Sequence, residues 1–206
     1  ITSDKGAWVV YRATAPGLPL TERLGEILEA SLQQLPIARR MRWRDLSAEF
    51  VRPVRWLVVM IGTEVVPIEL FGCTASNQSQ GHRFMGKGAF EIRSPLEYTS
   101  QLAEHFVVAD RVDRQKMIWS ALMAKAESLG GAIPENNALL DEVTALVEWP
   151  AVLAGHFDER FLRVPSEVLV SAMREHQRYF HLIDEAGQLL PVVLTVANID
   201  SPKPEM

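Results

Sequence analysis

The spacing of apolar residues predicts a strand and then a helix near the start of the chain. Residues 7–12 are rich in β-branched and aromatic side chains and precede Pro16-Gly17, which is typical of a strand followed by a turn. From Thr21, leucine and isoleucine recur every three or four positions as far as Leu35, and Pro36 follows. This spacing predicts an amphipathic helix that packs by one face and ends before the proline.

A β-hairpin is predicted after this helix. Residues 51–61 are rich in Val, Ile, Leu and Trp, break at Gly62-Thr63, and resume in residues 65–71. The first strand has the composition of one buried on both faces. Pro53 and Pro67 cannot donate to a β-ladder, so we expect each near a strand end, at a bulge or on an edge.

Helices dominate the middle of the chain, after a short strand around Phe90. Ser94-Pro95-Leu96-Glu97 is typical of a helix start, with an N-cap serine and a glutamate three residues later. The three predicted helices run from Ser94 to about Phe106, from near Asp110 to Gly130-Gly131, and from Asn136 or Asn137 to just before Pro150.

The last third mixes strands and one helix. The predicted elements are an apolar stretch at 151–154, a helix at 165–177, and strands at 179–183 and 189–197 around a turn. This irregular order predicts an α+β fold with a mixed or antiparallel sheet and packed helices. We expect one module over residues 1–199, which we allow to be two subdomains with a break near residues 94–110. Residues 200–206 are expected to form a linker.

Composition predicts a cytoplasmic protein that is not embedded in a membrane. The 206 residues are 48% hydrophobic, which is enough to bury a core. The single cysteine, Cys73, leaves no intrachain disulfide and no thiolate-rich zinc site. The longest apolar run, from Trp56 to Ile61, is too short to cross a bilayer. The sequence opens at Ile1 without a methionine, so we expect it to be a piece of a longer chain.

The net charge argues against a protein that binds nucleic acids generally, but it is compatible with a local basic surface. The net charge is −5, whereas binding to phosphates favours an excess of Lys and Arg. The stretch between Ile37 and Trp56 nevertheless contains Arg39, Arg40, Arg42, Arg44, Arg52 and Arg55. Only Asp45 and Glu49 oppose them. These arginines form either a basic surface or ordinary solvated positions.

The glycine-bounded stretch Gly81–Gly88 nearly matches a phosphate-binding loop, but it lacks the final Ser or Thr and the strand before it. We therefore reject a nucleotide-hydrolysing loop. Two interpretations stay open. His82, Arg83 and Lys87 contact phosphate while Phe84 stacks on a base, or Phe84 anchors the loop to the core while the histidine and arginine make structural hydrogen bonds.

The segment from Met173 to Phe180 gathers two arginines, a histidine, an amide and two aromatic residues where a helix ends. Such groups suit a contact with RNA or with another subunit. They equally suit a half-buried strand start beside a charged helix end. His176 and His181 are five positions apart and do not share a helical face, so we reject a metal site. No catalytic, cofactor-binding or metal-binding residue is predicted.

Several segments, in order and at similar spacing, resemble the β subunit of the bacterial heterotetrameric glycyl-tRNA synthetase. They span nearly the whole chain. The segments are Met41–Trp43, Glu49–Trp56, Gly81–Phe84, Leu139–Pro150, His176–Phe180 and Val196–Ile199. Arg44 stands where that family usually has glycine.

This resemblance implies an α2β2 enzyme, a glycine–tRNA ligase, in which the α subunit uses ATP and Mg²⁺ and performs the chemistry. It implies that the β subunit serves tRNA(Gly), and that this chain is part of its N-terminal half and is not catalytic alone. The equivalent region is thought to be similar to the B3/B4 module of phenylalanyl-tRNA synthetase β. We therefore expect a fragment that contributes to tRNA presentation and subunit assembly. The alternatives are a scaffold that docks the α subunit or other β domains, and an editing-like aminoacyl-tRNA hydrolase.

The residues expected to contact RNA or another subunit come from the basic stretch, the glycine-bounded loop and the segment at the helix end. They are Arg42, Arg52, Arg55, His82, Arg83, Arg174, His176, Gln177, Arg178 and Tyr179.

Overall fold

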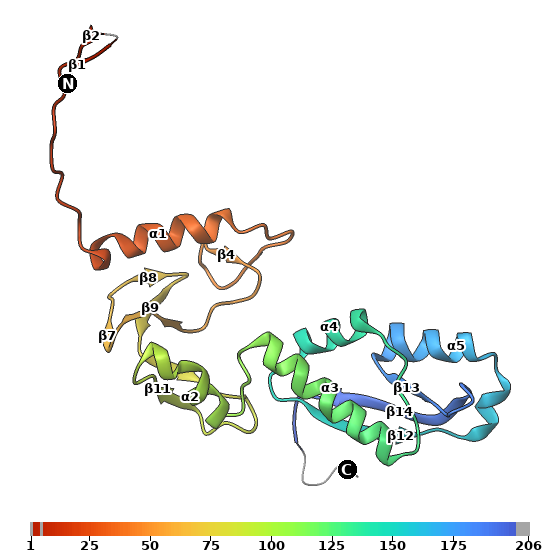
Figure 1. The fold of residues 1–206 in the computed structure, drawn as a ribbon. Coiled ribbons are helices and arrows are strands. Elements are labelled where there is room, and N and C mark those ends of the chain that lie inside the picture. The colour runs from red at the N-terminus through yellow and green to blue at the C-terminus, as the bar shows by residue number, and fades with distance from the viewer. Residues whose placement is uncertain (1, 5, 201–206) are drawn as a thin grey trace. The chain divides into compact units, whose positions relative to one another are not determined.

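A computed structural model describes residues 2–4 and 6–200 (Figure 1). The chain has the predicted α+β fold, with helices and several small antiparallel or mixed sheets. It divides into two compact units, one ending at Ser76 and the other beginning at Asn77. The similarity to the B3/B4 module stays a prediction, and most of the expected linker, residues 201–206, lies outside the described residues.

The first unit combines one helix with very short strands. These elements are β1 (Thr2–Ser3), β2 (Gly6–Ala7), α1 (Leu20–Gln34), β3 (Met41–Arg42), β4 (Glu49–Phe50), β5 (Leu57–Val58), β6 (Met60–Ile61), β7 (Glu64–Val65), β8 (Glu69–Leu70) and β9 (Cys73–Ser76). Strand β9 is the middle of a three-stranded sheet, parallel to β5 and antiparallel to β8.

The core of the first unit is small. Val66, Ile68 and Ala75 are its buried apolar residues among those described, and the α1 side chains Leu24 and Leu28 pack against them. The predicted helix is therefore confirmed, and so is its packing by one face. No residue of α1 is fully buried, however, because the sheet beneath it is only three strands wide.

Two strand predictions in the first unit are wrong. Residues 8–19 carry no regular structure, because within the described chain β2 pairs only with β1. Residues 51–56 are also irregular, and Leu57 and Val58 are half-buried rather than buried on both faces. The hairpin turn at Gly62-Thr63 is confirmed, since β6 pairs with β7 across it. Pro53 and Pro67 lie outside the strands, as expected.

Arg44 has a left-handed backbone, with φ of 55°. This conformation favours glycine, which has no Cβ to clash with the backbone. A glycine would adopt this conformation without that clash.

The second unit contains the larger sheet and most of the helices. Its elements are β10 (Gln78–Gln80), β11 (Ala89–Glu91), a 3₁₀ turn (Pro95–Glu97), α2 (Tyr98–Glu104), α3 (Arg111–Ser128), α4 (Asn137–Leu146), β12 (Ala151–His156), a 3₁₀ turn (Glu159–Arg163), α5 (Ser166–Ser171), a π-helical turn (Ala172–His176), β13 (Phe180–Ile183) and β14 (Leu189–Ala197).

The core of the second unit lies between one face of this sheet and two helices. Strand β14 is central, and it pairs antiparallel with β12 and β13. Helices α3 and α4 cover the face on which Phe180 and Leu194 are buried, and Ile118 and Leu122 of α3 are fully enclosed. The next residues along the strands, such as Val193, belong to the opposite face.

The predicted helix starts are confirmed by their caps. Ser94, Asp110 and Asn136 each accept a hydrogen bond from a backbone N–H of the helical turn that follows. These contacts satisfy N–H groups that have no partner inside the helix. Glu97 differs from a capping box, because its carboxylate forms an ion pair with Arg93 at 2.8 Å.

The boundary between the two units lies ahead of the interval 94–110 in which we allowed for a break. That interval belongs to the second unit, because Gln101 is buried and bridges two backbone groups near β11. Its side chain donates to the carbonyl of Glu91 and accepts from the N–H of Arg93. No helix in the described part of the chain is long and apolar enough to span a membrane.

Candidate functional site

A buried histidine fixes the backbone of the glycine-bounded loop. The His82 side chain is enclosed, and its Nδ1 accepts from the N–H groups of Phe84 at 3.3 Å and Met85 at 3.2 Å. The His82 N–H donates to the carbonyl of His105 at 2.9 Å, and Gly86 donates back to the carbonyl of His82 at 2.8 Å. The loop is thus closed by hydrogen bonds that involve its own backbone.

Two of the three glycines of this loop, Gly81 and Gly86, are needed for close backbone packing. A Cβ on Gly81 would lie 2.5 Å from the carbonyl oxygen of His105, and one on Gly86 would lie 2.6 Å from that of His82. Both distances are shorter than backbone contacts allow. Any side chain at either position would therefore displace the backbone that His82 holds.

The loop presents an aromatic ring and a guanidinium group to solvent. Phe84 is 74% exposed, and the guanidinium carbon of Arg83 lies 5.6 Å from the centre of its ring. In the second interpretation, the part that has Phe84 anchor the loop to the core is wrong, because this residue is exposed. The part that has the histidine make structural hydrogen bonds is confirmed. An exposed ring beside a cation can stack on a nucleobase and contact phosphate.

The basic stretch of the first unit is partly neutralised. Arg42 forms an ion pair with Glu49 at 2.7 Å across strands β3 and β4. Arg52 and Arg55 are exposed, and neither forms an ion pair within the described residues, although Arg52 donates to the carbonyl of Val51. Two of the three predicted arginines therefore keep their charge available.

Arg178 has a structural role at the end of the π-helical turn. Its guanidinium forms an ion pair with Glu142 of α4 at 2.9 Å and donates to the carbonyl of Glu175 at 2.9 Å. Its backbone is left-handed, with φ of 56°. Arg178 thus redirects the chain from the turn into β13, and its charge is already paired.

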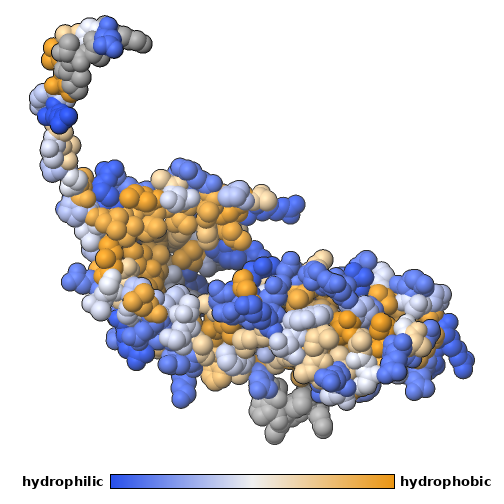
Figure 2. Space-filling model, in the orientation of Figure 1, coloured by the Kyte–Doolittle hydropathy of each residue, from blue (hydrophilic) through white to orange (hydrophobic). Residues whose placement is uncertain are grey.

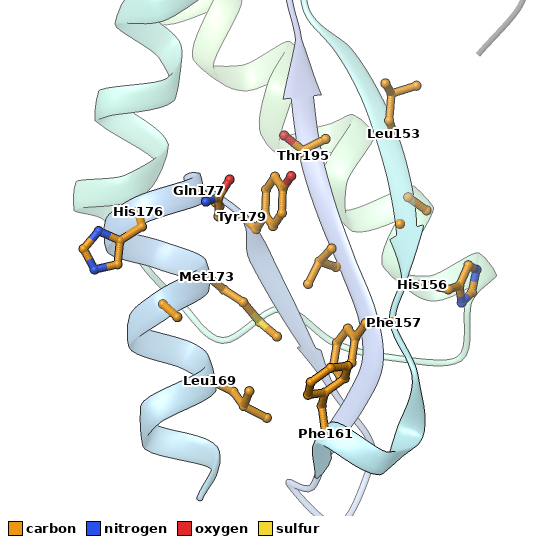
Figure 3. A pocket seen from close by; sticks show the side chains of 14 residues that line it. Leu153, His156, Phe157, Phe161, Leu169, Met173, His176, Gln177, Tyr179 and Thr195 are labelled. Atoms are coloured by element: carbon orange, nitrogen blue, oxygen red, sulfur yellow. The ribbon is translucent and has the colours of Figure 1, made fainter. Parts of the chain in front are cut away.

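Three of the four remaining predicted residues of this segment, His176, Gln177 and Tyr179, line a groove, whereas Arg174 does not. The volume of the groove is about 730 Å³, and it lies between α5 with its π-helical turn and the open face of the sheet. Leu153 and Val193 of the sheet face Leu169 and Met173 of the helix across it. Figure 3 shows Tyr179 and Thr195 at one end and Phe157 and Phe161 at the other. His176 lines the rim, and in Figure 3 its ring points away from the groove.

Gln177, Tyr179 and Thr195 place polar groups at one end of the groove, whereas His156 lies on the side of Phe157 (Figure 3). The backbone N–H of Tyr179 donates to the carbonyl of Met173 at 2.9 Å, which fixes this end to the π-helical turn. Arg174 is exposed. An apolar groove with hydrogen-bonding groups at one end can bind an apolar segment that carries a polar terminus.

Sequence reasoning missed the groove, although a weak signal was present. Along β12 and β14, apolar side chains occur on both faces of the sheet. This indicates that the face opposite α3 and α4 also packs against another segment. The side of the groove formed by Leu169 and Met173 depends on where α5 crosses the sheet. That placement cannot be read from local spacing.

His181, on β13, has its pKa held below the ordinary value of 6.5. Burial of the ring is the main cause, and the positive charge of Arg174 adds to it. No three His, Cys, Asp or Glu side chains gather as metal ligands in the part of the chain that the structure describes.

Together, these observations describe an α+β chain with two candidate binding surfaces, the presented Arg83–Phe84 pair and the apolar groove. The chain belongs to the glycyl-tRNA synthetase beta subunit family, whose pattern it matches over residues 1–206.

Curated relatives agree with this assignment. The chain is 43% identical to the glycine–tRNA ligase beta subunit of Marinobacter nauticus over 98% of its length, and 42% identical to that of Hahella chejuensis over 100%. It is 41% identical to that of Moorella thermoacetica over 94%. The chain spans only 28–30% of the length of these relatives.

Proposed function

We propose that this chain contributes to tRNA presentation and subunit assembly in a glycine–tRNA ligase. In this proposal it is part of the β subunit of an α2β2 enzyme that acts on tRNA(Gly) in the cytoplasm. The α subunit binds ATP, Mg²⁺ and glycine and forms glycyl-tRNA, while residues 1–206 bind none of them. Family membership over the whole chain supports this role.

The observation that carries the RNA contact is the exposed Arg83–Phe84 pair. A folded protein gains stability by burying a phenylalanine ring, yet Phe84 is 74% exposed while His82, two residues before it, is enclosed. The loop therefore uses its buried hydrogen bonds to hold an aromatic residue outward. Unpaired bases of RNA stack on such rings, and a nearby guanidinium contacts phosphate.

This contact is tested by substituting Phe84 and Arg83 in the complete synthetase and measuring the Kd for tRNA at several salt concentrations. Phe84→Ala is expected to weaken binding by about 5- to 100-fold, because one base stack is lost. Arg83→Ala is expected to reduce the slope of log K against log salt by about 1, because one phosphate contact is lost.

Two exposed residues of the same unit serve as matched controls. Leu96 is an exposed apolar side chain outside the loop, and Arg93 is an exposed arginine already paired with Glu97. Leu96→Ala and Arg93→Ala should leave tRNA binding unchanged. If Phe84→Ala and Arg83→Ala bind tRNA as tightly as the unaltered enzyme, this loop does not contact RNA.

The groove supports a second candidate role, docking of another part of the synthetase. Its walls are apolar and include Met173, whose flexible side chain adapts to different surfaces. Met173→Asp would place a charge in the groove and should reduce co-purification of the α and β subunits if the α subunit docks there. Unchanged co-purification would remove the α subunit as the occupant.

A further inference from the structure

The extended segment Trp8–Tyr11 is the feature of the first unit that its own fold does not explain. Four consecutive residues are large, apolar or aromatic, and all have high β-strand propensity. Val9 is 103% exposed and Tyr11 is 89% exposed. Among the described residues, none pairs with Val9, Val10 or Tyr11 in a β-ladder.

The pattern of these residues specifies the kind of strand they form. In an extended chain, Trp8 and Val10 point to one face and Val9 and Tyr11 point to the other. A strand with one solvated face alternates apolar and polar residues, whereas a strand covered on both faces is apolar throughout. Residues 8–11 therefore have the composition of an inner strand with packing on both sides.

Other apolar side chains of the first unit are also exposed to solvent. The exposed fractions are 55% for Leu20 and 47% for Ile27, both on α1. Further large apolar side chains, Trp56, Ile61 and Val65, are 38–40% exposed on or beside the strands. Figure 2 shows hydrophobic residues gathered at the surface over α1 and the neighbouring strands. Large apolar side chains that gather at a surface are typical of a site of protein contact.

We infer that residues 8–11 form an inner strand of a β-sheet whose neighbouring strands belong to the part of the β-subunit polypeptide outside these 206 residues. The curated relatives are long enough to contain such neighbouring strands, since this chain spans 28–30% of their length. The same apolar polypeptide would cover the exposed side chains of the first unit. This inference does not depend on the proposed tRNA contact.

A segment of the same polypeptide fits better than a separate chain. A tether between two segments holds them at millimolar effective concentration, so pairing within one chain precedes pairing between chains. An apolar strand left open during synthesis pairs with other copies and aggregates, so early cover within the chain avoids that hazard.

Hydrogen exchange of backbone amides in the full-length β subunit tests this inference. The amides of residues 9–11 should exchange at least about 100-fold more slowly than unstructured amides, because a ladder protects them. In the 206-residue chain the same amides should exchange at nearly the unstructured rate. Unprotected amides in the full-length subunit would overturn the inference. Protection that requires the α subunit, or that depends on β-subunit concentration, would also overturn it by identifying a separate chain as the partner.

Proline substitutions add a second measurement. Val10→Pro removes an N–H that the ladder needs and should reduce protection of the neighbouring amides at least about tenfold. Ala15→Pro lies in the irregular residues before α1 and should leave protection unchanged. Equal protection in both variants would contradict the inference, and if Val10→Pro is insoluble, the exchange of the unaltered subunit decides.

Discussion

At the scale of single residues, the structure separates groups that look alike in the sequence. His82 and Arg83 are adjacent and both polar, yet His82 is enclosed and bonds two backbone N–H groups, whereas Arg83 lies beside an exposed ring. Arg178 and Arg174 are also both basic, but the charge of Arg178 is paired with that of Glu142. Composition identified these segments as unusual, but burial decides which side chains can meet a partner.

His181 gives the second unit a pH dependence at the residue scale. Its pKa is lowered in the folded state, so the fold favours the neutral ring. Above the ordinary value of 6.5 the ring is neutral in both states and its contribution is complete. Below that value the unfolded chain takes up a proton that the folded chain resists, so stability falls with decreasing pH. The Tm of the His181→Gln variant should therefore fall less than that of the unaltered chain when the pH is lowered from about 7 to about 5. Thermal unfolding at both pH values checks this, and equal losses would contradict it.

At the scale of elements, the sequence predicted those that local chemistry determines. The caps at Ser94, Asp110 and Asn136 and the spacing of leucines in α1 were sufficient to locate the first four α-helices. Apart from the β6–β7 hairpin, the strands of the first unit were not predicted, because most of them have only two residues and leave no periodic signal. The parallel pairing of β5 with β9 depends on contacts far apart in the sequence. The groove left only a weak signal in the sequence for the same reason.

Neighbouring residues of α3 should respond differently to truncation. Leu122 is fully enclosed between α3, α4 and the sheet, so Leu122→Ala is expected to cost about 2–5 kcal/mol of unfolding free energy. Met123 is the next residue and is 41% exposed, so Met123→Ala should cost less than about 0.5 kcal/mol. Urea unfolding of the two variants measures both values. Similar costs would show that the core is not packed as described.

At the scale of the whole molecule, the two units differ in how much apolar surface they bury. The main core cluster of the second unit contains twelve buried residues, from Ile118 to Leu194. The first unit buries three among the described residues. Hydrophobic burial is the main favourable contribution to folding, so the second unit has the larger share of the stability.

The two units should therefore behave differently when expressed separately. A chain of residues 77–206 is expected to unfold in a single cooperative transition, because its sheet and helices share one core. A chain of residues 1–76 is expected to lack such a transition, because three buried residues cannot offset the entropy of ordering it. Circular dichroism during heating distinguishes the outcomes, and a sharp transition in residues 1–76 would show that the first unit is self-sufficient.

The close packing of Gly81 and Gly86 has a consequence for how this loop can diverge. A side chain at either position would clash with a backbone oxygen. His82 is restricted as well, because its Nδ1 accepts two backbone hydrogen bonds. Phe84 and Arg83 are under no such restriction. The loop backbone is thus held independently of the side chains at positions 83 and 84, so these two residues can be exchanged while the backbone keeps its conformation.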